Sequence, residues 1–147
     1  MSMLTIHPQL LKDCHFLGRL TSTDVLLHRN ASLPWFILVP DTEFPDFLDL
    51  PSEHGQAVLA DCAAISGFIK NLLGFDKVNF AGLGNVVPQM HLHIIGRTSV
   101  DPCWPQPVWG NLVDSETYPA ETLEEWQQAL VHMLQLEPSR LDSEHRL

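Results

Sequence analysis

Residues 89–95 read QMHLHII, a stretch in which polar and apolar side chains alternate. Successive side chains of a β-strand point to opposite faces, so this alternation predicts a strand with Gln89, His91 and His93 on one face. The intervening apolar residues, which occupy the other face, are Met90, Leu92 and Ile94. The pattern therefore predicts a half-buried strand with its apolar face in the core and its histidine face open to solvent.

The two histidines of this strand suit several kinds of chemistry. His91 and His93 are two positions apart, so about 6.6 Å separates them along the backbone, and both rings can engage one phosphate-sized group. A neutral imidazole can attack while a protonated one donates a proton near neutral pH. A His-x-His pair can also supply two metal ligands, although zinc or iron requires a third. The pair alone leaves nucleophilic, metal-binding and purely structural histidines as open alternatives.

Further segments on both sides of this strand have recognisable periods. Apolar residues recur at steps of three and four from residue 53 to 73, which predicts a long helix ending near Gly74. A turn with two glycines over 82–85 leads into the histidine strand. The short β-forming runs that predict neighbouring strands are 25–27, 36–39 and 77–81, the first two joined by a hairpin over 29–34.

The C-terminal part of the chain predicts a second helix. Thr122 and Glu125 have the spacing of an N-terminal capping box, and apolar residues continue at helical spacing behind them. Residues 137–147 are polar and without period, so we expect a flexible tail after a domain that spans 1–136. The expected fold class is α+β, with an antiparallel sheet of about five strands, one long helix and a C-terminal helix.

Composition limits the class of partner. The 147 residues suffice for one ordinary domain, and 45% hydrophobic residues suffice to build its core. The formal net charge of −10 disfavours nucleic acid, whose phosphates require clustered lysine and arginine. The three cysteines are widely spaced, which fits neither a disulfide framework nor a zinc site. No apolar run approaches the length of a membrane span or a signal segment, so we expect a cytoplasmic protein without membrane contact.

The stretch 89–95 resembles the motif of the histidine triad (HIT) family, His-φ-His-φ-His-φ-φ, with Gln89 in place of the first histidine. The order of the expected elements from about residue 5 to residue 110 also resembles that fold. Three further strings, at 77–79, 84–89 and 104–110, resemble a bacterial branch related to dinucleoside polyphosphate hydrolases.

The resemblance implies a function and a set of site residues. His91 would attack the α-phosphate of a nucleotide conjugate or dinucleoside polyphosphate and form a covalent nucleotidyl-histidine, which water then hydrolyses. His93 would contact the phosphate and leaving group, and Gln89 would orient its neighbours. The substrate contacts that the resemblance implies are Asn79, Asn85 and Arg29.

The same resemblance implies a homodimer and no metal or other cofactor. Retention of His93 favours hydrolysis over nucleotidyl transfer, because the transferase branch has glutamine at that third position. The alternatives that remain open are a nucleotidyl transferase, a nucleotide-binding protein with weakened turnover, and a His-x-His metal enzyme. In the loop 104–110, packing is the expected role of Trp104 and Trp109.

Overall fold

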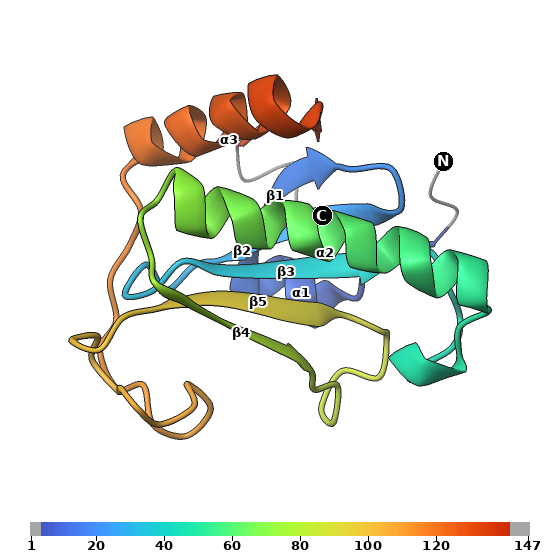
Figure 1. The fold of residues 1–147 in the computed structure, drawn as a ribbon, viewed down its shortest axis with the longest axis horizontal. Helices are drawn as coiled ribbons and strands as arrows, with labels where there is room; N and C mark the ends of the chain where they lie inside the picture. The colour runs from blue at the N-terminus through green and yellow to red at the C-terminus, as the bar shows by residue number, and fades with distance from the viewer. Residues whose placement is uncertain (1–3, 142–147) are drawn as a thin grey trace.

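The computed structural model describes residues 4–141, which form a six-stranded antiparallel sheet with helices on both faces (Figure 1). The strands are ordered β4-β5-β3-β2-β1-β6. Their bounds are Cys14–Arg19 for β1, Thr23–His28 for β2, Trp35–Pro40 for β3, Lys77–Gly82 for β4, Leu92–Arg97 for β5 and Glu137–Pro138 for β6. The helices are α1 (Pro8–Asp13), η1 (Phe47–Asp49), α2 (Ser52–Asn71) and α3 (Ala120–Leu134). The predicted α+β class, with its long helix and C-terminal helix, is confirmed.

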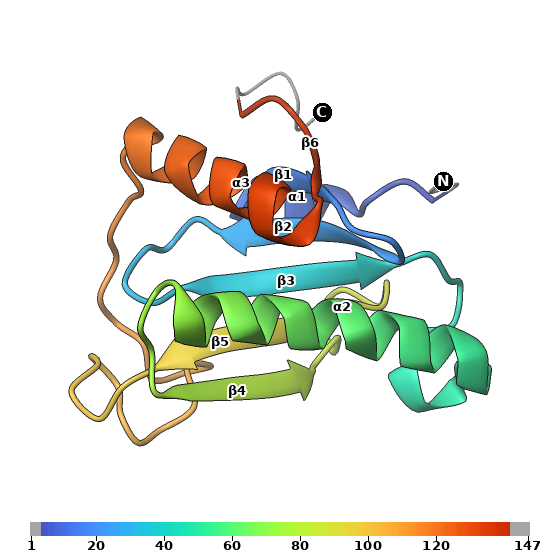
Figure 2. The ribbon, with the colours of Figure 1, turned by 45° about the horizontal axis from the view of Figure 1, so that its top comes forward.

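The sheet separates two hydrophobic cores. Helices α2 and α3 lie on one face, and α1 lies on the opposite face (Figures 1 and 2). The α2 face contains Met90, Leu92 and Ile94, as the alternation of residues 89–95 predicts. The α1 face contains a second cluster built around Leu10, Trp35 and Ile95. Both faces of the central strands are therefore buried, which explains why β3 is apolar at every position.

The prediction that the histidine face is open to solvent is wrong. His91 is 6% exposed and His93 is 4% exposed, because the second core and the segments around it cover this face. The strand also begins later than predicted, at Leu92 instead of residue 89. The pairing of β5 ends at Leu92, which lies opposite Gly82 of β4 and Leu38 of β3.

The ends of the predicted C-terminal helix and tail also differ. Helix α3 begins at Ala120 after Pro119, so the capping box predicted at Thr122 and Glu125 does not form. The first residues of the predicted flexible tail form strand β6, which pairs with β1. Gly18 permits this pairing, because a Cβ at its positive φ of 152° would collide with the Glu137 carbonyl. The rest of the predicted tail, 142–147, lies outside the described residues.

No helix within residues 4–141 combines the length and the apolar character that crossing a membrane requires.

Candidate active site

His91 lies immediately before β5, where the chain from the β4–β5 turn folds back over the sheet. Its ring packs against His93, with 5.0 Å between the ring centroids. The turn comes very close at Gly84, where a Cβ would lie 2.9 Å from the Val87 carbonyl oxygen and 3.6 Å from Cε1 of His91. A side chain at this position would displace the turn, so Gly84 allows the backbone to approach the histidine.

A hydrogen bond fixes the tautomer of His91. Its Nδ1 lies 2.7 Å from the backbone carbonyl oxygen of Gln89. A carbonyl oxygen can only accept, so Nδ1 carries the proton and donates it. In the neutral ring, Nε2 then has a free lone pair, which is the form of imidazole that can attack an electrophile.

The neighbouring His93 is held in the opposite tautomer. Its Nδ1 accepts a hydrogen bond from Nε1 of Trp35 at 3.0 Å, so Nε2 carries the proton and points toward the Leu83 carbonyl oxygen at 3.4 Å. Burial, with a smaller contribution from His91, lowers the pKa of His93 to about 4. His93 is therefore a neutral hydrogen-bond donor near neutral pH, and the protonated acid that the sequence interpretation invoked does not fit this position.

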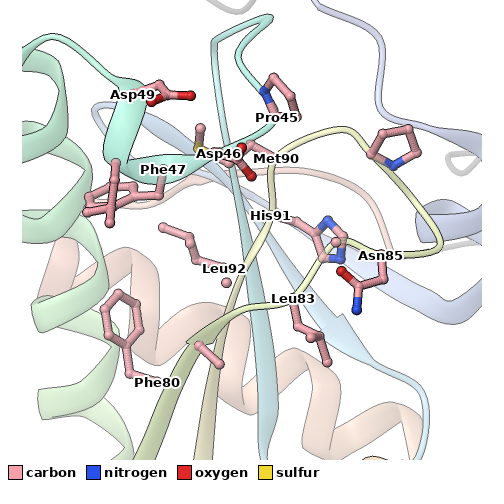
Figure 3. A pocket seen from close by; sticks show the side chains of 15 residues that line it. Pro45, Asp46, Phe47, Asp49, Phe80, Leu83, Asn85, Met90, His91 and Leu92 are labelled. Atoms are coloured by element: carbon pink, nitrogen blue, oxygen red, sulfur yellow. The ribbon is translucent and has the colours of Figure 1, made fainter.

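Two cavities flank the His91 ring. One, of about 450 Å³, lies between the turn and the α1 face of the sheet, and the other, of about 610 Å³, lies between the turn and η1. Leu83, Asn85 and His91 line both cavities. Figure 3 shows the second cavity, with His91 between the η1 residues on one side and Leu83 and Asn85 on the other. A group bound at His91 can thus extend in two directions.

Aromatic rings form much of the wall of the cavity beside α1. His28 stacks on Trp35 with 4.3 Å between centroids and an angle of 11° between planes. Trp109 approaches both Trp35 and His93 edge-on, with centroid distances of 5.8 and 4.9 Å. Burial lowers the pKa of His28, which favours the neutral form of this ring in the cavity wall. Such a surface suits a flat apolar or heteroaromatic group.

The structure brings only some of the sequence-predicted site residues together. Asn85 is exposed and lines both cavities beside His91. Asn79 lies away from them, where its Oδ1 accepts a hydrogen bond from the buried guanidinium of Arg97 at 2.8 Å. Arg29 also lines neither cavity, and it donates to the Lys12 carbonyl at the end of α1. Of the three predicted substrate contacts, Asn85 is the one that lines these two cavities.

The side chain of Gln89 contacts neither histidine by a hydrogen bond. Its Oε1 accepts from the backbone N–H of His7 at 2.8 Å, and its Nε2 donates to the Thr5 carbonyl at 3.0 Å. The contact that orients His91 comes instead from the main-chain carbonyl of Gln89. The expected orienting role thus belongs to the backbone at this position.

Several residues that line the cavities had no signal in the sequence. Trp35 and His28 belong to strands recognised only as β-forming runs, and the partner of Trp35 is 58 positions away. Helix α1 supplies Gln9 and Asp13 but has only six residues, too few to show a helical period. Trp109 was expected to pack, and it does pack, but against His93 at the site.

The metal-binding alternative requires a third ligand near the His-x-His pair. Across residues 4–141, no group of three or more His, Cys, Asp or Glu side chains is placed to hold a metal ion. The arrangement at His91 combines a ring nitrogen that has a free lone pair in the neutral ring, a neutral N–H donor and two adjoining cavities.

Comparisons with known proteins identify the family of this chain. The HIT domain family model matches residues 10–100. A histidine triad protein from Marinobacter aquaeolei VT8 is 39% identical, covering 91% of this chain and 98% of that chain with a TM-score of 0.82. The histidine triad protein blr8122 from Bradyrhizobium japonicum is 32% identical, with coverages of 88% and 97% and a TM-score of 0.82. SMc02904 from Sinorhizobium meliloti 1021, a histidine triad protein, is 28% identical, with coverages of 90% and 98% and a TM-score of 0.83. A search of curated proteins finds no match.

Proposed function

The chain belongs to the HIT domain family, and from this premise we propose that it is a nucleotide hydrolase with His91 as its nucleophile. The observation that carries the proposal is the fixed tautomer of His91, whose Nδ1–H donates to the Gln89 carbonyl and leaves the lone pair of Nε2 free in the neutral ring. Nε2 attack on the α-phosphorus of a nucleotide conjugate is the reaction that this geometry supports best.

The proposed reaction has two displacements at phosphorus. In the first, a bond forms between Nε2 of His91 and the α-phosphorus, and the bond to the leaving group breaks. The departing atom keeps the electron pair of that bond and takes a proton from solvent. In the second, water attacks phosphorus, the Nε2–phosphorus electron pair returns to His91, and the water proton passes to solvent. The products are the leaving group and a nucleoside monophosphate.

Two groups around His91 stabilise the charges that develop during this reaction. After the first displacement the imidazole is positively charged, and its Nδ1–H continues to donate to the Gln89 carbonyl. His93 offers a neutral Nε2–H, which exchanges its long 3.4 Å contact with Leu83 for a phosphoryl oxygen as negative charge develops there. The Trp35 hydrogen bond keeps this proton on Nε2.

The two cavities suggest how the substrate is divided. We assign the nucleoside to the cavity beside α1, because the rings of Trp35, His28 and Trp109 offer it aromatic surfaces. The leaving group then occupies the cavity beside η1, which Phe47, Phe80 and Met90 line together with two carboxylates. Asn85 lines both cavities, and we assign it a contact with the phosphate between them.

The charges around these cavities favour one substrate class over another. Within the described part of the chain, neither cavity is lined by lysine or arginine, whereas Asp46 and Asp49 line the leaving-group cavity. A polyphosphate bridge would place several negative charges there without a cation to pair with. An uncharged or cationic leaving group, such as the amine of a nucleoside phosphoramidate, fits the acidic lining.

We expect a nucleoside 5′-phosphoramidate of an alkylamine to be hydrolysed with kcat/KM at least about tenfold above that of a dinucleoside tetraphosphate. Rates are measured by product analysis with adenosine and guanosine versions of both compounds. Acid quench during turnover, followed by mass spectrometry, should show a nucleotidyl adduct on the peptide containing His91.

The opposite preference would show that the acidic lining does not select the leaving group. Direct hydrolysis with inversion at a chiral phosphorus, and no adduct, would contradict the two-step course. Binding of nucleotides without turnover of any compound would support the alternative of a binding protein. Added chelator serves as a control, because the proposed reaction uses no metal.

We also propose that the protein forms a homodimer through the β4 edge of the sheet. Among residues 4–141, strand β4 ends the strand order and has no neighbour on its outer side. A groove beside it continues onto α2 and is lined largely by apolar residues, among which Leu59 is 42% exposed and Phe80 is 49% exposed. A second copy placed on a twofold axis would extend the sheet and cover these side chains.

Leu59→Lys should weaken dimerisation at least about tenfold, because each symmetric interface would receive two charges beside Lys70. Sedimentation velocity across a range of concentrations measures the effect. Val113→Lys is the matched control, because Val113 is 89% exposed and outside the groove. A dimer unaffected by Leu59→Lys, or a monomeric wild type, would contradict this interface.

A further inference from the structure

Gln89 was expected to orient the neighbouring histidines and Arg29 to contact the substrate, yet the side chains of both bind main-chain groups at the ends of helix α1. We propose that these two residues are positioning residues, which hold α1 at its two ends and thereby set the shape of the nucleoside cavity. The proposal rests on the proposed function only for the identity of the ligand, since the contacts themselves are those of the folded chain.

At the N-terminal end of α1, the Gln89 amide uses both of its polar atoms on the main chain. Oε1 accepts from His7 N–H, and Nε2 donates to the Thr5 carbonyl, the pattern of two backbone bonds in a sheet. His7 is also the N-cap of α1, where its Nδ1 accepts from the Gln9 N–H at 3.0 Å. Through His7, Gln89 joins the beginning of α1 to the segment that contains the nucleophile.

At the C-terminal end of α1, Arg29 provides the corresponding contact. Its Nε donates to the Lys12 carbonyl at 2.9 Å, and its backbone N–H donates to the Asp13 carbonyl at 2.9 Å. The carbonyls of the last helical turn have no partner within a helix, so these bonds satisfy groups that would otherwise need water. Arg29 thereby joins the end of α1 to the β2–β3 connection.

Helix α1 depends on such contacts because it is short. A helix of six residues does not persist by its own backbone bonds, and Leu10 is its one buried side chain. The helix nevertheless presents Gln9, Leu10 and Asp13 to the nucleoside cavity, which Trp35 also lines. A displacement of either end of α1 would therefore alter this wall while leaving the bond between His91 and the Gln89 carbonyl in place.

The first test uses Gln89→Ala, which retains the carbonyl that orients His91. We expect KM and the dissociation constant for adenosine or guanosine monophosphate to rise about two- to tenfold, the range for one or two partly solvated hydrogen bonds. The kcat at saturation should change by less than about twofold. Amide hydrogen exchange at Leu10 and Leu11, whose N–H groups donate to the His7 carbonyl, should become faster.

A second variant and a control keep the test decisive. Arg29→Met removes the side-chain bonds to the Lys12 carbonyl and to His15, while the main-chain bond to Asp13 remains, and it should produce a similar rise in KM with faster exchange at the end of the helix. Gln56→Ala removes a glutamine that lies on α2 and outside both cavities, so it should change neither quantity. The imidazole proton signal of His91 Nδ1–H in NMR should be the same in all variants.

Two results would overturn the proposal. A fall in kcat for Gln89→Ala with unchanged KM would place the amide in the chemistry, and unchanged exchange in α1 would show that the contact does not hold the helix. If the wild type neither binds nor hydrolyses nucleotides, the proposed function fails, while the exchange measurements still decide whether Gln89 and Arg29 hold α1.

Discussion

Alanine in place of His91 is expected to lower kcat by at least about 10³-fold and to eliminate the nucleotidyl adduct. The physical reason is that Nε2 of His91 is the proposed attacking atom. The neighbouring His93 cannot replace it, because His93 is held with its proton on Nε2. Steady-state rates and acid-quench mass spectrometry on the variant measure both effects.

The variant needs a stability measurement because the His91 ring is buried. Its loss removes the hydrogen bond to the Gln89 carbonyl and the contact with His93, at a cost of about 1 to 3 kcal/mol. Urea unfolding should still show a folded protein. His132→Ala is the matched control, because His132 is exposed on α3 and lines neither cavity. Turnover by His91→Ala near the wild-type rate would remove His91 as nucleophile.

The elements that the sequence predicted correctly are those with a local period. The long helix is apolar at steps of three and four, and the segment 89–95 alternates, so side-chain spacing alone assigns Met90, Leu92 and Ile94 to the α2 core. The same spacing correctly placed His91 and His93 on one face, now seen in the 5.0 Å approach of their rings.

The failures share a different cause, which is that they depend on partners far away in the chain. Nothing near His93 in the sequence indicates that Trp35 donates to its Nδ1 or that Trp109 covers it. The same reason explains why the histidine face was expected to be open. Its cover consists of a six-residue helix and irregular loops, neither of which has a period to detect.

Gln89 and Arg29 illustrate a further limit. A motif fixes where a residue lies along the backbone, but it does not fix which groups the side chain reaches. Gln89 occupies the first position of the motif, yet its amide binds residues more than 80 positions away. The orienting hydrogen bond that the motif implies is made by the Gln89 carbonyl, an atom that every amino acid has.

His93→Phe is expected to lower kcat by roughly 10² to 10³-fold, the usual cost of removing one preorganised donor from a developing oxyanion. Phenylalanine keeps a ring of similar size but cannot accept from Trp35 or donate to phosphate. The nucleotidyl adduct at His91 should still form, more slowly, which distinguishes this variant from His91→Ala. A rate within about threefold of the wild type would show that His93 does not act on the phosphoryl group.

The same variant tests the neutral state of His93 through stability. An unfolded histidine binds its proton as the pH falls through about 6.5, whereas the pKa of folded His93 is about 4. Between these values the unfolded state holds the extra proton, so His93 makes the wild type less stable as the pH falls from 6.5 to 4, and this loss ends below pH 4. His93→Phe lacks this contribution but retains the other histidines. As the pH falls over that range, the unfolding free energy of the wild type should therefore decrease more than that of the variant. Urea titrations from pH 4.5 to 7.5 can measure this change. A difference that is constant with pH would mean that His93 titrates normally in the folded protein, and its assignment as a neutral donor held by Trp35 would be wrong.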